Sequence, residues 1–210
     1  MTNTNRLAVI TGGSRGLGKH AALHLAKAHV DSIITYRSHP EEAHAVVAEL
    51  EKAGVKAAAL PFDASKSSSF EGFATNLKQT LAQRFGRERF DFLVNNAGHG
   101  LMKPFTDTTE AELDELFAVH VKAPYLLTQR LLPLLADGGR VLNVSTGLAR
   151  FTLPGYSAYA AMKGAIEVLT RYQAKELGAR GISVNVIAPG AIETDFGGGH
   201  VRDNPQLNGF

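Results

Sequence analysis

The chain has 210 residues, 44% of them hydrophobic, which is enough to bury one core and predicts a single domain over residues 1–210. Lysine and arginine together number 22 against 20 for aspartate and glutamate, so the charge balance gives nucleic acid no driving force for binding. Cysteine is absent, which excludes disulfides and thiol catalysis and fits a reducing compartment.

The first predicted elements are a strand, a glycine loop, a helix and a second strand. Leu7–Thr11 is a short apolar run typical of a strand buried on both faces, and the glycine-rich segment 12–18 follows it directly. Good helix formers begin at Lys19, and a second apolar run spans 32–36. The glycines permit a tight turn that brings backbone N–H groups to a pyrophosphate, and Gly18 would let the helix pack close to the strand. The pattern predicts a dinucleotide-binding βαβ unit.

The end of the second strand favours NADP(H) over NAD(H). An NAD site carries a carboxylate about 20 residues after the glycine loop, where it binds the ribose 2′-hydroxyl. This chain has Tyr36, Arg37 and Ser38 there, and Arg15 adds a second cation inside the glycine loop. A guanidinium binds phosphate oxygens with two hydrogen bonds, which suits the 2′-phosphate of NADP(H). The alternative is that both arginines are only solvated.

Helices and strands alternate through the rest of the chain. The remaining predicted helices span Glu41–Ala53, Ser67–Phe85, Thr109–Leu135 with a bend or interruption at Pro124, and Tyr156–Leu177. The remaining predicted strands span Val55–Leu60, Phe90–Val94, Arg140–Ser145 and Ile182–Ile187. This alternation predicts an α/β fold, a doubly wound parallel sheet with helices on both faces. Its ligand crevice should lie beyond the carboxyl ends of the strands.

Tyr159 and Lys163 stand four residues apart, so they share one face of the predicted helix 156–177. A free phenol has a pKa of about 10 and is a sluggish acid at neutral pH, whereas a nearby cation favours the phenolate and lowers that pKa. The pair is therefore a candidate proton donor and acceptor. Taken alone, a tyrosine and a lysine at this spacing also occur as solvated surface residues.

Four motifs in order identify a family. The glycine loop, the Asn-Asn-Ala-Gly segment 95–98, the pair Tyr159 and Lys163, and Pro189-Gly190 together resemble the short-chain dehydrogenase/reductase family in its common single-domain form. The resemblance runs from about residue 6 to 205. It implies a Rossmann-like sheet and reversible hydride transfer between a nicotinamide and a small-molecule carbonyl or alcohol. NADPH would favour the direction of reduction in cells.

The resemblance also implies a role for each motif residue. Tyr159 would be the general acid in reduction and the base in oxidation, while Lys163 would hold the nicotinamide ribose hydroxyls and lower the tyrosine pKa. Asp63 would lie beside the adenine, and Thr194 would hold the carboxamide. The full set that would contact the cofactor is Gly12, Ser14, Arg15, Gly16, Leu17, Gly18, Tyr36, Arg37, Ser38, Asp63, Ala64, Asn95, Ala97, Gly98, Tyr159, Lys163, Pro189, Gly190, Ile192 and Thr194.

Two positions depart from the family pattern. The substrate-polarising serine of relatives usually lies thirteen residues before the tyrosine, and counting back from Tyr159 gives Thr146, with Ser145 just before it. Threonine keeps the hydroxyl donor, so we assign this role to Thr146 and keep Ser145 as the alternative. His120 aligns with an asparagine that helps to hold a proton-relay water in relatives. An imidazole could also hold water and would titrate near ~6.5, or it could be a structural residue.

No metal site is expected. His20 and His24 are four residues apart on the first predicted helix, which is a spacing that a metal could use. The sequence lacks the His-Glu-x-x-His pattern there and shows no third ligand, so solvated or capping roles fit these histidines better.

The C-terminal region departs from relatives in length. In them a mobile substrate lid, another helix and a final strand follow the region of Gly197–Gly199, whereas six strands are visible here and the seventh is missing. A sheet lacking the last strand would leave the sixth as an exposed edge. The expected pocket walls are apolar and suggest a modest, partly hydrophobic carbonyl compound: Gly100, Leu101, Met102, Leu148, Phe151, Leu153 and Tyr156.

Oligomeric state and location follow from two further patterns. Small residues at 158, 160, 161, 164 and 165 would allow close helix packing, within the monomer or in the homodimer or homotetramer common in the family. No apolar run approaches membrane length and the first six residues form no signal sequence, so we expect a cytoplasmic protein without membrane contact. The alternative function is a nucleotide-binding regulator of the same fold without turnover.

The cofactor assignment predicts the effect of one substitution. Arg37→Ala should weaken NADPH binding by one to two decades, about 1.5–3 kcal/mol for a charge-assisted contact, and should barely change NADH binding. Fluorescence titration of both nucleotides measures this difference. Equal losses for NADPH and NADH would refute the assignment.

Overall fold

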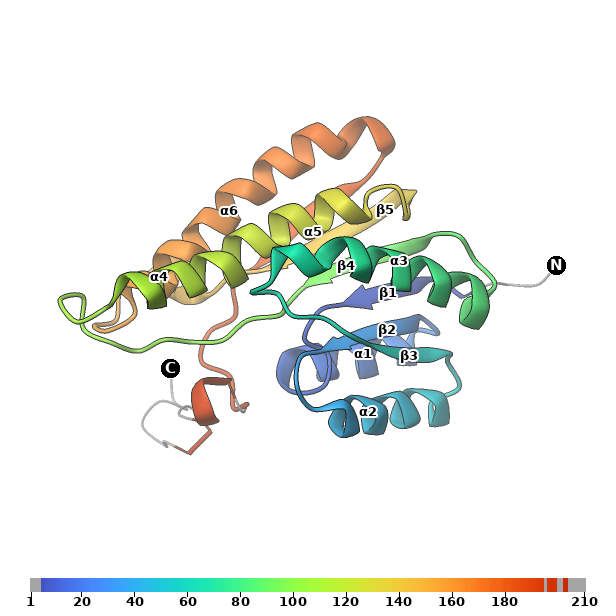
Figure 1. Cartoon of the computed structure of the whole chain (residues 1–210), viewed down its shortest axis with the longest axis horizontal. Coiled ribbons are helices and arrows are strands. Elements are labelled where there is room, and N and C mark those ends of the chain that lie inside the picture. The colour runs from blue at the N-terminus through green and yellow to red at the C-terminus, as the bar shows by residue number, and fades with distance from the viewer. Residues whose placement is uncertain (1–4, 195, 200–201, 204–210) are drawn as a thin grey trace.

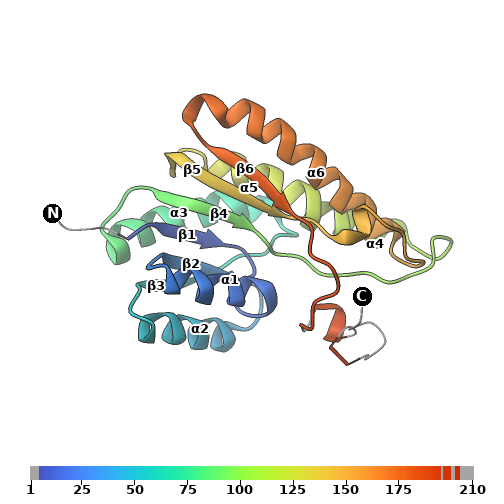
Figure 2. The same ribbon diagram turned by 180° about the vertical axis from the view of Figure 1, so that it is seen from behind.

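Six parallel strands form one sheet in the order β3-β2-β1-β4-β5-β6 (Figures 1 and 2). The structure is a computed structural model that describes residues 5–194, 196–199 and 202–203. The strands are β1 (Leu7–Ile10), β2 (Asp31–Tyr36), β3 (Ala57–Pro61), β4 (Phe90–Asn95), β5 (Leu135–Val144) and β6 (Ser183–Ile187). The predicted parallel, Rossmann-like α/β sheet is confirmed, and all the strands end at the same side of the molecule.

Helices cover the two faces of this sheet. The helices are α1 (Gly16–Lys27), α2 (Pro40–Lys52), α3 (Phe70–Thr80), α4 (Glu110–Phe117), α5 (Ala123–Leu131) and α6 (Ser157–Leu177). Helices α1 and α2 lie on one face, and the other four lie on the opposite face (Figure 1). Short 3-10 turns span Ser67–Ser69, Gly147–Ala149, Gly178–Arg180 and Phe196–Gly199, and π-helical turns span Leu81–Phe85 and Ala118–Lys122.

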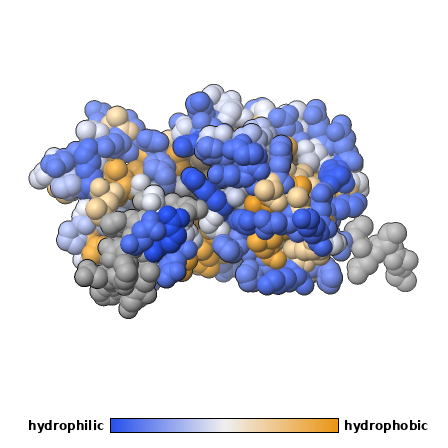
Figure 3. All heavy atoms as spheres, turned by 90° about the horizontal axis from the view of Figure 1, so that it is seen from below, coloured by the Kyte–Doolittle hydropathy of each residue, from blue (hydrophilic) through white to orange (hydrophobic). Residues whose placement is uncertain are grey.

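Strand alternation divides the interior into two cores. In β1, Leu7 and Val9 join the core under α3 and α5, whereas Ala8 and Ile10 join the core under α1 and α2. All four side chains are fully buried because a central parallel strand is covered on both faces. Most of the molecular face seen in Figure 3 is hydrophilic, and hydrophobic residues show there in separate patches.

The long helical region differs from its predicted bounds. It begins at Glu110 with a capping box between Thr109 and Glu112, and it passes through a π-helical turn at Ala118–Lys122 immediately before Pro124. Proline has no N–H to donate to the preceding turn, which explains why the hydrogen-bond ladder changes there. Helix α5 ends at Leu131, four residues before the predicted end, because Pro133 follows it.

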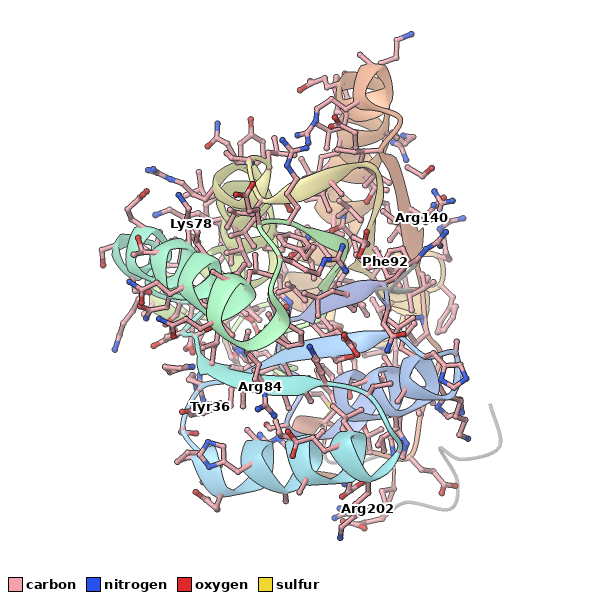
Figure 4. The ribbon with its side chains drawn as sticks, turned by 90° about the vertical axis from the view of Figure 1, so that its right-hand side faces the viewer. Tyr36, Lys78, Arg84, Phe92, Arg140 and Arg202 are labelled. Carbon is pink, nitrogen blue, oxygen red and sulfur yellow. The ribbon has the colours of Figure 1, made fainter. Side chains whose placement is uncertain are left out.

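Strand β5 begins earlier than predicted. It starts at Leu135 and not at Arg140, with a register shift opposite Phe90 and Phe92 that accommodates Gly138 at a positive φ of 73°. Past the irregularity, Phe92 pairs with Arg140, and Figure 4 labels this pair. Gly138 and Gly139 suggest a loop in the sequence, but in the structure they form a bulge within the strand.

The described sheet ends at β6. Val184 is buried, while Ser183, Asn185 and Ile187 alternate with it and are exposed. Helix α6 packs on one face of β6, and Figure 2 shows no described helix over the other face. The predicted edge position of the sixth strand is confirmed within the described residues.

Ion pairs join neighbouring elements at the periphery. Arg84, in the turn that follows α3, lies beside β3 and over α2, where its guanidinium pairs with Glu51 (Figure 4). Such exposed pairs contribute little to stability. Within the described part of the chain, no helix is long and apolar enough to cross a membrane.

Candidate active site

The glycine loop joins β1 to α1 and is closely packed. Gly12 and Gly16 have positive φ angles of 65° and 53°, which side-chain-bearing residues rarely adopt. A Cβ atom at Gly18 would overlap the carbonyl oxygen of Gly12, so the predicted close packing of Gly18 is confirmed. The first hydrogen bond of α1 runs from the Lys19 N–H to the Arg15 carbonyl at 3.2 Å, which leaves the N–H groups before it available to an anion.

Two residues that the sequence analysis missed hold the crevice together. The Thr11 hydroxyl accepts the N–H groups of Asn96 and Ala97, both at 3.0 Å. The Asn96 amide donates in return to the carbonyls of Thr11 and Gly12 at 2.9 and 3.0 Å. These bonds tie the ends of β1 and β4 to each other. Asn96 belongs to the Asn-Asn-Ala-Gly segment, and that position was the available signal.

The structure leaves the proposed phosphate-selecting residues exposed. Arg15, Arg37 and Ser38 lie on the surface, at the start of α1 and after β2. Neither arginine forms an ion pair within the described residues. Burial is the main cause that lowers the pKa of His99; the charge of Glu115 opposes this effect, and the charge of Arg37 adds to it.

The side chains of Asp63 and Asn95 differ in whether they are available to contact a ligand. Partial burial opposes ionisation of Asp63, but hydrogen bonds from Ser65 and the charge of Lys66 outweigh it and lower the pKa of the carboxyl. The Asn95 side chain is buried and donates to Asn143 at 2.8 Å and to Thr128 at 3.1 Å. The side-chain amide of Asn95 is therefore occupied inside the protein, and only its backbone remains for the predicted contact with a cofactor.

Tyr159 and Lys163 lie on the buried face of α6, as their spacing predicts. The Lys163 ammonium donates to the Val144 carbonyl at the end of β5 at 2.8 Å, and Nζ lies 5.7 Å from the centroid of the tyrosine ring. Burial lowers the pKa of Lys163 to about 8. The lysine is thus a buried cation with one protein acceptor for its three N–H groups.

The expected lowering of the tyrosine pKa is not present in this structure. Burial raises the pKa of Tyr159 to about 12, and the neighbouring Thr146 hydroxyl only partly offsets that rise. The Lys163 ammonium donates its hydrogen bond to the Val144 carbonyl and not to the phenol. In this state the phenol holds its proton throughout the neutral range.

Thr146 and Ser145 separate into different roles. The Thr146 hydroxyl lowers the pKa of the Tyr159 phenol through a side-chain hydrogen bond, and its assignment as the polarising residue stays a prediction. The Ser145 hydroxyl is buried and lies 3.1 Å from the Glu167 carboxylate and 3.2 Å from the Lys163 carbonyl. Ser145 is therefore engaged inside the protein and does not face the same space.

His120 is buried against Tyr159. The ring centroids lie 5.3 Å apart and the planes meet at 86°, so the imidazole contacts the phenol edge-on. Nε2 lies 2.8 Å from the His99 carbonyl, which requires a proton on Nε2, and Nδ1 has no partner within the described residues. Burial, aided by the Lys163 charge, lowers the pKa of His120 to about 3. The predicted titration near 6.5 is wrong for this buried ring.

The segment after β6 crosses the carboxyl ends of the strands toward α1 (Figures 1 and 2). The Pro189 carbonyl accepts the Gly147 N–H at 2.8 Å, and Thr194 lies beside Gly16 of the glycine loop. The predicted residues Gly190 and Ile192 are exposed along this path. Phe196, which the sequence analysis missed, places its ring 5.9 Å from that of Tyr159.

A groove of about 670 Å³ opens beside the first turn of α6, and Tyr159 is not part of its lining. Its walls are the segments 102–105 and 152–157, which a hydrogen bond from the Lys103 N–H to the Gly155 carbonyl joins at 2.8 Å. Of the predicted wall residues, four line this groove: Met102, Leu148, Leu153 and Tyr156. The predicted residues Gly100, Leu101 and Phe151 are not part of its lining.

The crevice fits a dinucleotide. A side chain at Gly12 would crowd Ala97, and one at Gly18 would overlap Gly12, so backbone alone lines this part of the crevice. An open helix N-terminus and two exposed arginines add the positive charge that phosphates require. The buried Lys163 has donors to spare for hydroxyl groups. Within the described residues no cluster of three metal-binding side chains occurs.

Comparisons with known proteins agree with this geometry. A family model for short chain dehydrogenase matches residues 6–204. Hydroxynaphthalene reductase-like protein Arp2 of Metarhizium brunneum (strain ARSEF 3297) is 35% identical over 192 residues, which cover 91% of this chain and 70% of that protein.

Two solved structures are similar over nearly the whole chain. The angucycline C-6 ketoreductase LanV with bound NADP has a TM-score of 0.91 at 33% identity, and the match covers 98% of this chain and 79% of the LanV chain. A short chain dehydrogenase from Burkholderia cenocepacia J2315 in complex with NADP has a TM-score of 0.87 at 34% identity, over 98% of this chain and 80% of its own.

The neutral state of His120 predicts how stability depends on pH. With a pKa of about 3 when folded and about 6.5 when unfolded, the unfolded chain binds the extra proton between these values. The free energy of unfolding should therefore fall as pH drops below about 6.5, by up to ~1.4 kcal/mol per pH unit from this residue. Urea unfolding at about pH 7.5 and about pH 5 should show a smaller loss for His120→Asn than for wild type, by ~2 kcal/mol.

The exposed His24 provides a matched control. His24→Asn should retain the wild-type dependence on pH, because this side chain is exposed on α1 and is not buried by folding as His120 is. Identical pH dependence in wild type and His120→Asn would contradict the assignment of a buried neutral ring.

Proposed function

This chain belongs to the short-chain dehydrogenase family, and from that membership we propose that it is an NADP(H)-dependent reductase of a carbonyl compound with Tyr159 as the proton donor. One observation carries the proposal: the Tyr159 phenol faces the Thr146 hydroxyl, and the Lys163 ammonium lies one helical turn away at the carboxyl end of the sheet. The family is one of oxidoreductases. The substrate and the role of each residue are our inference.

We propose NADP(H) over NAD(H) as the cofactor. Arg15 and Arg37 border the crevice, and no carboxylate follows β2 at the position where NAD sites carry one. Both solved relatives described above were determined with NADP, which supports the same choice here. When bound, NADPH would supply the hydride that reduces the carbonyl carbon. The glycine loop would hold its pyrophosphate, and Lys163 its nicotinamide ribose hydroxyls.

The chain's own residues supply the proton. Because the pKa of Tyr159 is about 12 in this structure, the phenol is protonated at neutral pH and is ready to donate its O–H proton to a carbonyl oxygen. Thr146 is proposed to hold that oxygen through its hydroxyl. His120 stays neutral, with its proton on Nε2, so it contributes an acceptor at Nδ1 and no charge. A protonated Tyr159 and a neutral His120 favour carbonyl reduction over alcohol oxidation at neutral pH.

A ring-containing, largely apolar ketone is the proposed substrate class. The groove beside the first turn of α6 is lined mainly by apolar side chains, including Met102, Leu148 and Leu153. Two of the relatives are a hydroxynaphthalene reductase-like protein and an angucycline ketoreductase, which supports an aromatic ketone. A regulator that binds the nucleotide without turnover is the alternative. The buried proton donor Tyr159 favours the enzyme, because a sensor has no use for it.

We further propose that the protein pairs through an apolar α4–α6 surface. Leu113 and Phe117 are exposed one turn apart on α4. Ala161, Val168 and Tyr172 form an exposed stripe at helical spacing on α6. Exposed apolar residues gathered on two adjacent helices are characteristic of protein interfaces. Pairing of this surface with a second copy would give the predicted homodimer, and the homotetramer would need a second interface as well.

Turnover is tested by following the NADPH absorbance with a bicyclic aromatic ketone, such as tetralone, and a short aliphatic one, such as butanone. Wild type should reduce the bicyclic ketone faster. Tyr159→Phe should lose at least about a hundredfold in kcat, since general acid catalysis contributes roughly 10²–10⁴-fold, with NADPH affinity within about twofold of wild type. NADPH binding without turnover of any ketone would favour the regulator.

The pairing proposal is tested by analytical ultracentrifugation. Wild type should sediment as a dimer or tetramer, and Tyr172→Glu should shift it toward monomer because a charge would be buried at the interface. Lys52→Glu, at an exposed position of α2 on the opposite face of the sheet, should leave the assembly unchanged. A monomeric wild-type protein would refute the proposal.

A further inference from the structure

Glu167 is a third polar residue on the buried stripe of α6. It follows Tyr159 and Lys163 at the same spacing of four residues, and the three side chains occupy successive turns of one helix face. A sheet-facing stripe is normally apolar, because ionised groups are costly to bury without partners. Glu167 is only 9% exposed, so its carboxylate requires compensation from the protein.

Two neighbours provide that compensation. Arg150 donates from Nε and Nη2 to one carboxylate oxygen of Glu167, at 3.1 and 2.8 Å. The Ser145 hydroxyl lies 3.1 Å from the other oxygen. The Arg150 hydrogen bonds are the main reason why the pKa of Glu167 is lowered, so the carboxylate is ionised at neutral pH. Glu167 therefore contacts the chain on both sides of a short segment.

That segment contains Thr146. Ser145 precedes it at the end of β5 and Arg150 follows it after the turn Gly147–Ala149, so the carboxylate of Glu167 joins both ends of the loop to α6. Tyr159 is carried by the same helix two turns earlier. The position of the threonine hydroxyl relative to the phenol is thus set through one carboxylate.

We propose that Glu167 is a positioning residue, which holds the Thr146 hydroxyl against Tyr159 by fixing Ser145 and Arg150. It touches neither substrate nor cofactor in this account. The inference rests on the proposed reductase function for its kinetic consequence. Its structural consequence, a fixed loop between Ser145 and Arg150, stands apart from any reaction.

The structural consequence is measured without substrate. The Gly147 N–H donates to the Pro189 carbonyl at 2.8 Å, so its hydrogen exchange reports how firmly the loop is held. Glu167→Gln keeps the size of the side chain but loses the charge that Arg150 requires. We expect Gly147 to exchange at least tenfold faster in this variant, while amides of the central strand β1 remain as in wild type. Unchanged exchange at Gly147 would overturn the proposal.

The kinetic consequence is measured on the same proteins. Glu167→Gln should lower kcat for ketone reduction about tenfold and leave the NADPH dissociation constant within twofold of wild type. Arg150→Ala should act in the same direction, and the double variant should be no slower than the slower single variant, because both changes release one clamp. Glu176→Gln, on the exposed side of the same helix, is the matched control and should match wild type.

The outcomes separate the two proposals. A wild-type protein that reduces no ketone would refute the reductase function, while the exchange of Gly147 would still decide the role of Glu167. If Glu167→Gln does not fold, Arg150→Ala replaces it, because the Arg150 side chain is 70% exposed and its loss leaves no cavity. Faster exchange in Arg150→Ala would support the clamp. Fully additive losses of kcat in the double variant would overturn it.

Discussion

The site depends on one electrostatic constraint, the burial of the Lys163 ammonium where α6 meets the end of β5. The lysine is 5% exposed, and its one described acceptor is the Val144 carbonyl at 2.8 Å. Burial lowers the pKa of Lys163 to about 8, because the charged form is less stable out of water. The same charge helps to keep His120 neutral, while burial raises the pKa of Tyr159. A protein accepts a destabilising buried charge chiefly where function requires it.

The parallel sheet brings the parts of this site together. Its strands all end at one side, so the glycine loop, the Asn96 segment and the Thr146 loop meet although they are far apart in the sequence. Hydrogen bonds between strand ends fix their spacing, as those of Thr11 and Asn96 do for β1 and β4. Helix α6 then presents Tyr159, the proposed proton donor, against strand ends that are already fixed. The chemistry is thus built on rigid elements, while the segment that carries Phe196 approaches from the other side.

Local patterns were sufficient to predict the sheet, the glycine loop and the buried face of α6, because strand alternation and helical spacing act over a few residues. They were insufficient where the outcome depends on distant packing. Asn95 could face the crevice or the interior, and only its partners on β5 and α5 decide the matter. The pKa of Tyr159 is raised, opposite to the prediction, because residues distant in sequence bury the phenol, and the rings of His120 and Phe196 lie beside it. Gly138 reads as a loop residue, yet it forms a bulge within β5.

The central claim is that the buried Lys163 ammonium binds the nucleotide. The most direct measurement is the NADPH dissociation constant between about pH 7.5 and about pH 9.5. In the protein without nucleotide, the pKa of Lys163 is about 8 and that of Tyr159 about 12. Because Lys163 loses its charge as pH rises through this range, the affinity for NADPH should fall by up to about tenfold per pH unit. Lys163→Met should bind more weakly with no dependence on pH in this range. An affinity that is constant across it in the wild-type protein would contradict the account.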